Sequence, residues 1–161
     1  MDRREVSFSY NVFANKSAFS EQDQLLLQHA SNATGTAYAP YSKFKVGVAI
    51  RTSDHQIITG SNQENGSFPI GQCAERVAIY RLTHELGRVP IDSIAILVDN
   101  EHQKSPASPC GSCRQILNEY RSFQDKPIRL ILGSARSEEI YEIHDVKDLL
   151  PFAFDGLFLG L

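Results

Sequence analysis

The sequence of 161 residues lacks any apolar run of roughly 18 residues or more, which excludes a helix that crosses a bilayer. It also lacks an excess of positive charge, since 16 lysines and arginines stand against 19 aspartates and glutamates, for a net charge of −3. Proteins that bind nucleic acid backbones or anionic lipid through their overall charge are more basic, so both partner classes are disfavoured. The hydrophobic content of 42% and the charged content of 22% are near globular averages and exclude wholesale disorder.

Cysteine is scarce, and the first residues lack the continuous apolar segment of a secretory signal. We therefore expect a cytoplasmic location and no framework of disulfides. The three cysteines, Cys73, Cys110 and Cys113, all lie in two short motifs. This clustering is the most informative feature of the composition.

The apolar pattern changes between helical and strand periodicity along the chain, without a linker or an internal repeat. A helix is expected to begin at Ser20, with Asp23 placed as in a capping box, and to end at Gly35. The other expected elements are a strand over 5–13, strands over 45–51 and 56–60, a helix over 73–86, a strand over 91–98, a helix over 108–120, strands over 128–132 and 140–143, and a helical turn over 146–150.

Helices that alternate with buried strands predict an α/β fold. We expect a three-layer α-β-α sandwich around a mixed sheet of about five strands. Residues 1–19 are expected to form an N-terminal extension that contains a strand, and residues 20–161 a single domain. Residues 152–161 are unusually apolar for a chain end, and the sequence leaves open whether they pack on their own domain, on a neighbouring subunit or over a site.

The motif Pro109-Cys110-Gly111-Ser112-Cys113 has the features of a helix start. Ser108 is a good N-cap, and Pro109 is a good first helical residue. Two cysteines three positions apart in an opening turn are neighbours on one face, where unpaired N–H groups and the helix dipole favour thiolates. Two adjacent thiolates predict a zinc site.

Cys73 supplies a third sulfur, with Glu75 two residues further on. Three protein ligands leave one tetrahedral position open, as in catalytic zinc sites, whereas structural sites close all four. A closed site with His84 or His102 as fourth ligand, and a cluster that binds no metal, remain alternatives. Because both side chains point to one centre only if Cys73 precedes the regular helix, we expect Cys73 at the very start of that helix.

Three thiolates leave zinc with a net negative charge, which weakens its ability to acidify a bound water. Some group must withdraw charge from the sulfurs. Arg76 and Arg114 stand beside motif residues and are candidates to donate hydrogen bonds to thiolates, with surface arginines of no such role as the alternative.

Residues 73–76, Cys-Ala-Glu-Arg, followed by residues 109–115, Pro-Cys-Gly-Ser-Cys-Arg-Gln, closely resemble the zinc site of the small homotetrameric zinc-dependent cytidine deaminases. Residues 39–47 and 62–65 are similar to the family's strand that enters the site and to its ribose-contact segment. With the segment 149–151, the likeness covers about residues 20–156, so that residues 20–161 resemble the catalytic domain.

The resemblance implies one zinc ion per subunit and hydrolytic deamination of cytidine and deoxycytidine to uridine and deoxyuridine plus ammonia, in pyrimidine salvage. In this chemistry a water activated by zinc attacks C4, and Glu75 carries the protons. Cys73, Cys110 and Cys113 are implied as the metal ligands. The implied assembly is a homotetramer.

The resemblance also implies the substrate contacts. The Ala74 backbone N–H would bind the pyrimidine O2, and Asn62 and Glu64 would bind the ribose 3′-hydroxyl. Phe44 is similar to the family's aromatic wall beside the base. Phe154 is similar to a tail phenylalanine that, in relatives, reaches a site from another subunit.

Three alternatives remain. A related deaminase of another small aminopyrimidine nucleoside, such as blasticidin S, would share the zinc site. A non-catalytic zinc-binding module is disfavoured by the open metal position and by Glu75. Editing of polynucleotides is disfavoured by the net charge of −3 and by the lack of a basic aromatic stripe.

Overall fold

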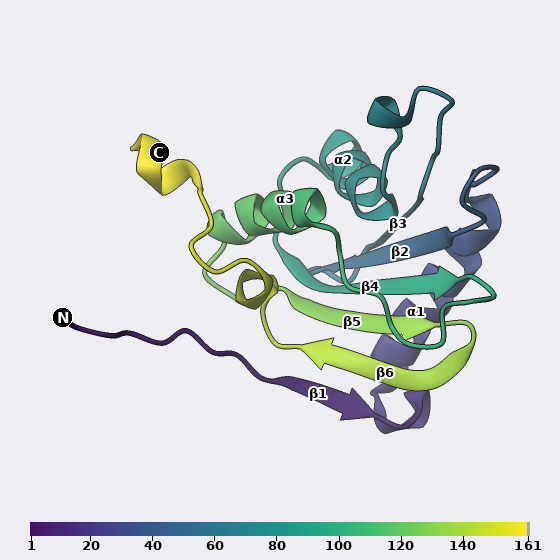
Figure 1. The fold of residues 1–161 in the computed structure, drawn as a ribbon, viewed down its shortest axis with the longest axis horizontal. Coiled ribbons are helices and arrows are strands. Elements are labelled where there is room, and N and C mark those ends of the chain that lie inside the picture. The colour runs from purple at the N-terminus through teal and green to yellow at the C-terminus, as the bar shows by residue number, and fades with distance from the viewer. Residues whose placement is uncertain (161) are drawn as a thin grey trace.

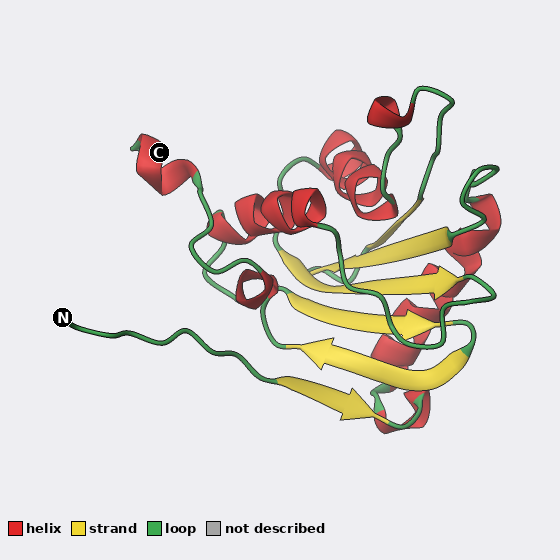
Figure 2. Cartoon of the chain, in the orientation of Figure 1, coloured by secondary structure: helices red, strands yellow, loops and turns green. Residues whose placement is uncertain are grey.

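A six-stranded sheet lies between one helix on one face and two helices on the other (Figures 1 and 2). The computed structural model describes residues 1–160. The helices are α1 (Glu21–Ala33), α2 (Ala74–Leu86) and α3 (Gly111–Ser122). The strands are β1 (Tyr10–Phe13), β2 (Lys45–Thr52), β3 (Ile57–Ser61), β4 (Ile91–Asp99), β5 (Arg129–Ser134) and β6 (Ser137–Ile143).

The strand order is β1-β6-β5-β4-β2-β3. Strands β4 and β5 pair in parallel and are joined through α3, whereas the other neighbouring pairs are antiparallel. The predicted three-layer α/β sandwich with a mixed sheet is therefore confirmed, with six strands where about five were expected. Among residues 1–160, no helix is long and apolar enough to cross a membrane.

The additional strand is β1, in the predicted N-terminal extension, and it forms one edge of the sheet. Only Tyr10–Phe13 forms a strand, where 5–13 was expected, because only these residues pair with Ile140–Ile143 of β6. Residues 1–9 lie exposed beyond the end of β6 (Figure 1). The division of the chain at residue 20 stays a prediction, since β1 joins the sheet formed by the rest of the chain.

The start of the third helix differs from the expectation. α3 begins at Gly111 with Cys110 as its N-cap, so the prediction of Ser108 as N-cap and Pro109 as first helical residue was wrong. Pro109 fits the extended backbone before a helix as well as it fits the first turn, and the sequence does not distinguish the two. The expected start of α1 is confirmed in part: Ser20 is the N-cap, and its hydroxyl accepts the Asp23 N–H at 3.2 Å, whereas the Asp23 carboxylate accepts the Ser20 hydroxyl proton and not, as in a capping box, the Ser20 N–H.

Two apolar cores fill the space between the layers. On one face, α1 packs on the middle of the sheet through residues that are nearly free of solvent contact: Leu26, Leu27, Ala30, Ala49, Ala95 and Ile131. The opposite core, below α2 and α3, is larger and includes Val48, Ala78, Ile79, Leu82, Ile94, Leu117 and Leu130. Strand β4 contributes to both cores, which explains its almost uninterrupted apolar sequence.

Two glycines allow helices to lie directly on the sheet. A Cβ atom on Gly60 of β3 would stand 2.5 Å from the backbone nitrogen of Ala78 and 2.9 Å from the carbonyl oxygen of Ala74, both in α2. A Cβ on Gly47 of β2 would stand 2.1 Å from the carbonyl oxygen of Ala30 in α1. Because these neighbours are backbone atoms, a side chain at either position displaces a whole helix.

We therefore predict that Gly60→Ala destabilises the fold by about 2–3 kcal/mol, the upper range for an overpacked core. For a chain of this length, that change lowers the Tm by several degrees, which differential scanning calorimetry measures. Gly35→Ala is the matched control, because a Cβ there meets no atom within 4 Å. Equal melting temperatures for the two variants would contradict the close approach of α2.

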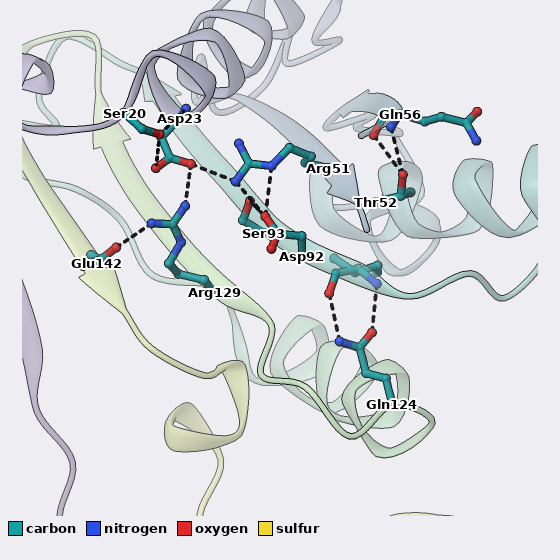
Figure 3. A network of polar contacts seen from close by, with 11 residues as sticks. Ser20, Asp23, Arg51, Thr52, Gln56, Asp92, Ser93, Gln124, Arg129 and Glu142 are labelled. Carbon is teal, nitrogen blue, oxygen red and sulfur yellow. Dashed lines mark hydrogen bonds and ion pairs between the residues drawn. The ribbon is translucent and has the colours of Figure 1, made fainter. Parts of the chain in front are cut away.

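A partly buried ion network joins the start of α1 to residues of the four central strands, β2, β4, β5 and β6 (Figure 3). Arg51, with a side chain only 8% exposed, donates to Asp23 at 2.9 Å and to Asp92 at 2.7 Å. Arg129 donates to Asp23 and, at 2.9 Å, to Glu142. Asp23 is thus held by two cations and by the Ser20 hydroxyl, which outweigh the opposing effect of its burial and lower the pKa of its carboxyl.

The lowered pKa makes part of the stability dependent on pH. A carboxyl with a folded-state pKa below its usual 3.8 stabilises the fold fully above that value, and the contribution is lost as the pH falls through the folded-state pKa. We predict that Asp23→Asn costs about 3 kcal/mol at neutral pH, since it leaves buried Arg51 short of a partner. Chemical denaturation should show a constant difference between wild type and variant from about pH 7 to 5, and a smaller one below about pH 4. A difference that grows on acidification would contradict this assignment.

Candidate metal and catalytic site

The N-termini of α2 and α3 meet beside the sheet, and the N-cap residue of each helix is a cysteine. Cys73 is the N-cap of α2, with an extended backbone (φ −70°, ψ 151°), and Cys110 is the N-cap of α3. Cys113 follows in the first turn of α3 and is fully buried. The expectation that Cys73 precedes the regular helix is confirmed, and this is what allows Cys73 and Glu75 to serve one centre.

The three sulfur atoms lie within 4.8 Å of one another, and those of Cys73 and Cys110 are 3.9 Å apart. Sulfurs bound to zinc at about 2.3 Å with tetrahedral angles lie about 3.8 Å from each other. The three cysteines are unpaired by disulfides. Their number, chemistry and spacing therefore fit a zinc ion held by three thiolates.

The cluster holds no fourth protein ligand in the part of the chain that the structure describes. Within residues 1–160, the group comprises the three cysteines without a histidine or carboxylate. His102 lies on the wall of the same cavity, whereas His84 lines a separate cavity between α2 and α3. This arrangement favours the open site over the closed structural one.

In the metal-free structure, the surroundings of the cluster favour a negatively charged sulfur on Cys73. A hydrogen bond from the Cys113 thiol and the neighbouring Arg76 guanidinium lower the pKa of Cys73 to about 5. The same hydrogen bond, together with burial, raises the pKa of Cys113. Without a metal, these shifts favour the thiolate form of Cys73 and the protonated form of Cys113.

Arg76 and Arg114 have different surroundings. The Arg76 Nη2 lies 3.8 Å from the Cys73 sulfur and 3.2 Å from the Gly71 carbonyl oxygen, in keeping with the predicted charge withdrawal. All three nitrogens of Arg114 instead donate to oxygens, at distances of 2.8–3.2 Å, on Pro109, Ser108 and Leu149. The structure does not bring Arg114 to the sulfurs as predicted, because its long side chain folds back to join the loop before α3 to the C-terminal segment.

Glu75 lies in the first turn of α2 and is only 7% exposed. Burial raises the pKa of its carboxyl, and the nearby Cys73 thiolate acts in the same direction. A carboxyl with a raised pKa takes up a proton more readily than an ordinary glutamate, which suits it to proton transfer beside a metal site.

The cluster opens into a cavity of about 880 Å³. Its walls include most of the residues predicted to form the site, namely Phe44, Asn62, Glu64, Cys73, Ala74, Glu75, Arg76 and Cys110. Tertiary structure thus brings together segments that lie far apart in the sequence. The volume is ample for a small molecule of the size of a nucleoside.

The family model described as "Cytidine and deoxycytidylate deaminase zinc-binding region" matches residues 20–125. This chain belongs to the cytidine and deoxycytidylate deaminase family. It is 40% identical over 131 residues to a cytidine deaminase of Halalkalibacterium halodurans, a match that covers 81% of this chain and 92% of the relative. A cytidine deaminase of Sporosarcina psychrophila is 38% identical over 129 residues, which cover 80% of this chain and 88% of the relative.

Solved structures of the family share the fold. The crystal structure of cytidine deaminase from Burkholderia pseudomallei superposes with a TM-score of 0.71 at 33% identity, and covers 81% of this chain and 98% of its own. That of the Mycobacterium tuberculosis enzyme gives 0.65 at 31% identity, with 81% and 95% covered. Membership in this family makes the chain a zinc-binding hydrolase, in agreement with the cysteine cluster.

The predicted ribose contacts, Asn62 and Glu64, also hold the protein together. Asn62 accepts the Val46 N–H through Oδ1 and donates to the Phe44 carbonyl through Nδ2, both at 2.8 Å. Glu64 accepts the N–H groups of Tyr41 at 3.0 Å and Ser42 at 3.3 Å. Each side chain lines the cavity and keeps spare hydrogen-bonding capacity, since an amide has a second N–H and a carboxylate about four acceptor positions.

Sequence reasoning missed Ser42, which lines the same cavity and donates its hydroxyl proton to Glu64. It also missed Asn100, which donates to the Lys43 carbonyl at 3.2 Å. A local sequence feature could have indicated Ser42, because a serine two residues before Phe44 can accept the Phe44 backbone N–H. Asn100 had no local signal, because its partner lies more than fifty residues away in the chain.

Phe154 lies outside the cavity of its own chain. Its carbonyl accepts a hydrogen bond from Gln115 of α3 at 2.7 Å, and its ring stacks on Phe158. The side chains of Phe152, Phe154 and Phe158 are 96%, 57% and 72% exposed. Over residues 152–160, the tail therefore projects from the domain instead of burying these rings on it (Figure 1), so the expectation that the tail packs on its own domain is not met there; Leu161 lies outside the described residues.

We predict about one zinc ion per chain by elemental analysis, and much less in each of Cys73→Ser, Cys110→Ser and Cys113→Ser, because losing one of three thiolates strongly weakens a zinc site. Removal of zinc by a chelator should lower the Tm, and added zinc should restore it. His102→Ala is the control for the closed site and should keep its zinc. Zinc loss in that variant would make His102 a fourth ligand.

Proposed function

We propose that this protein converts cytidine and deoxycytidine by hydrolysis to uridine and deoxyuridine, with release of ammonia. The observation that carries the proposal is the buried carboxyl of Glu75 beside an incomplete three-sulfur metal site, inside a cavity of nucleoside size. The family relatives named above are cytidine deaminases, which supports the same substrate class. Neither blasticidin S nor a non-catalytic zinc module receives support from them.

Zinc, when bound by the three cysteines, supplies a Lewis acid that activates water. Glu75 would take a proton from the water that attacks C4 and deliver it to N3 of the pyrimidine. The C–O bond would form in this attack. Glu75 would then carry the remaining proton of the new C4 hydroxyl to the C4 amine, so that the C–N bond breaks, a carbonyl forms at C4 and ammonia leaves. The raised pKa of this carboxyl suits it to both transfers.

The other cavity residues would bind and orient the nucleoside. The Ala74 N–H lies at the first position of α2, where N–H groups have no acceptor within the helix, and would donate to the pyrimidine O2. Phe44 would pack beside the base. Asn62 and Glu64 would contact the ribose 3′-hydroxyl with the donor and acceptor positions that the protein leaves free.

The charge of Glu64 favours nucleosides over nucleotides. The hydrogen bond from Ser42 lowers the pKa of the Glu64 carboxyl and so keeps it ionised at neutral pH. A carboxylate near the sugar repels a 5′-phosphate. We therefore propose cytidine and deoxycytidine as substrates and disfavour their monophosphates.

We further propose a cytoplasmic homotetramer that acts in pyrimidine salvage. The exposed rings of Phe152, Phe154 and Phe158 support an assembly, since a projecting apolar tail gains stability when a neighbouring subunit covers it. Phe154 would then reach the cavity of another subunit. The proposed reaction would serve pyrimidine salvage, because it converts cytidine and deoxycytidine to uridine and deoxyuridine.

The decisive assay follows the absorbance of cytidine, deoxycytidine and their monophosphates, with and without a chelator. We predict turnover of the nucleosides alone, and loss of that turnover with the metal. Glu75→Ala should keep zinc and lose kcat on the order of 10⁴-fold, the upper range for one general acid–base group. Glu138→Ala, an exposed glutamate on β6, is the matched control. Near-normal turnover by Glu75→Ala would remove the proposed mechanism, and wild-type protein inactive on all four compounds would remove the proposed function.

A further inference from the structure

The turn before strand β2 is held in an uncommon conformation beside the cavity. Lys43 has a φ of 58°, in the left-handed region that few non-glycine residues adopt. On either side of it, the Ser42 hydroxyl accepts the Phe44 N–H at 3.0 Å and donates its own proton to Glu64. A single hydroxyl therefore connects the backbone of Phe44 to a carboxylate of another segment.

The Glu64 carboxylate receives three hydrogen bonds from this turn, from the N–H groups of Tyr41 and Ser42 and from the Ser42 hydroxyl. Two of these donors are backbone groups that any residue at position 42 would keep. The hydroxyl is the contribution that belongs to serine. It is also the main reason that the pKa of Glu64 is lowered.

The backbone carbonyl of Phe44 is hydrogen-bonded to a side chain, as its N–H is. Asn62 donates to the Phe44 carbonyl at 2.8 Å. Between Asn62 and Glu64, Gln63 pairs with the backbone of Gln72 through two hydrogen bonds of 2.8 Å, directly before Cys73. The residues that hold Phe44 are thus tied by backbone hydrogen bonds to the segment that carries a metal ligand.

We propose that Ser42 is a positioning residue, whose hydroxyl links Glu64 to the Phe44 backbone and so fixes the Phe44 ring at the cavity wall where the base would bind. This inference rests on the proposed deamination of cytidine. Ser42 acts through Phe44, and its loss should weaken binding of the ground state and of the transition state alike. Such uniform binding changes KM and leaves kcat nearly unchanged.

The first test is Ser42→Ala. We expect KM for cytidine to rise about fivefold and kcat to change less than about twofold, the size of one lost hydrogen bond that acts on binding alone. The inhibition constant of the product uridine should rise by the same factor. Ser42→Thr, which keeps the hydroxyl, should restore both constants. Ser53→Ala, in the exposed turn at the other end of β2, is the matched control.

A double-mutant cycle separates positioning from general stabilisation. Phe44→Ala alone should raise KM, and adding Ser42→Ala to it should have no further effect, because the ring that Ser42 positions is absent. Zinc content should equal that of wild type in all these variants. Additive effects of the two substitutions on KM, or loss of zinc in Ser42→Ala, would overturn the proposal.

The outcomes also separate this proposal from the function on which it rests. Wild-type protein without activity on cytidine removes both. Active wild type together with an unchanged KM in Ser42→Ala removes the role of Ser42 alone. If Ser42→Ala fails to fold, Ser42→Cys replaces it in the test, because cysteine keeps the size of serine but weakens both hydrogen bonds. A raised KM with normal zinc content in Ser42→Cys supports the positioning role. An unchanged KM overturns it.

Discussion

The meeting of two helix N-termini beside one sheet is the constraint on which the rest of this structure depends. Each helix has a cysteine as its N-cap. The sulfurs of Cys73 and Cys110 come within 3.9 Å because α2 packs on β3 and β2, and α3 packs beside α2 on the same core. Gly60 sets the depth of α2, since the helix backbone lies where a side chain of β3 would otherwise stand. A close-packed core thus places thiolates with the spacing that a metal ion needs.

The electrostatics of the site follow from this placement. Helix N-termini favour negative charge, and Arg76 adds a cation beside the Cys73 sulfur. Glu75, buried in the same first turn, shares the positive end of the dipole, yet burial and the nearby thiolate favour its protonated form. In the metal-free protein the surroundings therefore shift these two acidic groups, two residues apart, in opposite directions: the pKa of the Cys73 thiol is lowered and the pKa of the Glu75 carboxyl is raised.

The cavity wall also includes polar side chains, Asn62 and Glu64, that hydrogen-bond to the backbone of neighbouring segments. The Asn62 side chain makes the hydrogen bonds to the Phe44 carbonyl and the Val46 N–H that a neighbouring strand would otherwise make. The Glu64 carboxylate accepts the backbone N–H groups of Tyr41 and Ser42 in the turn before β2. A side chain that is fixed by the protein presents its remaining donor or acceptor at a defined place, so little entropy is lost when a ligand binds. The same arrangement couples the wall to Cys73 through Gln63 and Gln72.

Much of the fold could be predicted from local sequence, because periodicity and turn chemistry report which residues share a face. Spacings of a few residues indicate the order of the elements, the mixed sheet and the N-cap at Ser20. They also indicate that the side chains of Cys110 and Cys113 lie next to each other. These spacings also indicated a metal site with Cys73 and Glu75. The boundary of α3 was predicted wrongly, since Pro109 is compatible with both sides of a helix start.

The sequence by itself therefore determined the layered architecture and the metal-binding chemistry, and it predicted Glu75 as the residue that carries protons. Only the tertiary structure decided the length of β1, the turning away of Arg114 from the sulfurs, the projection of Phe154 into solvent and the linkage of Ser42 to Glu64. The physical reason is the distance along the sequence between the residues that interact. Helical and strand periods act over neighbouring residues, whereas these contacts join segments whose separation is set by the path of the whole chain.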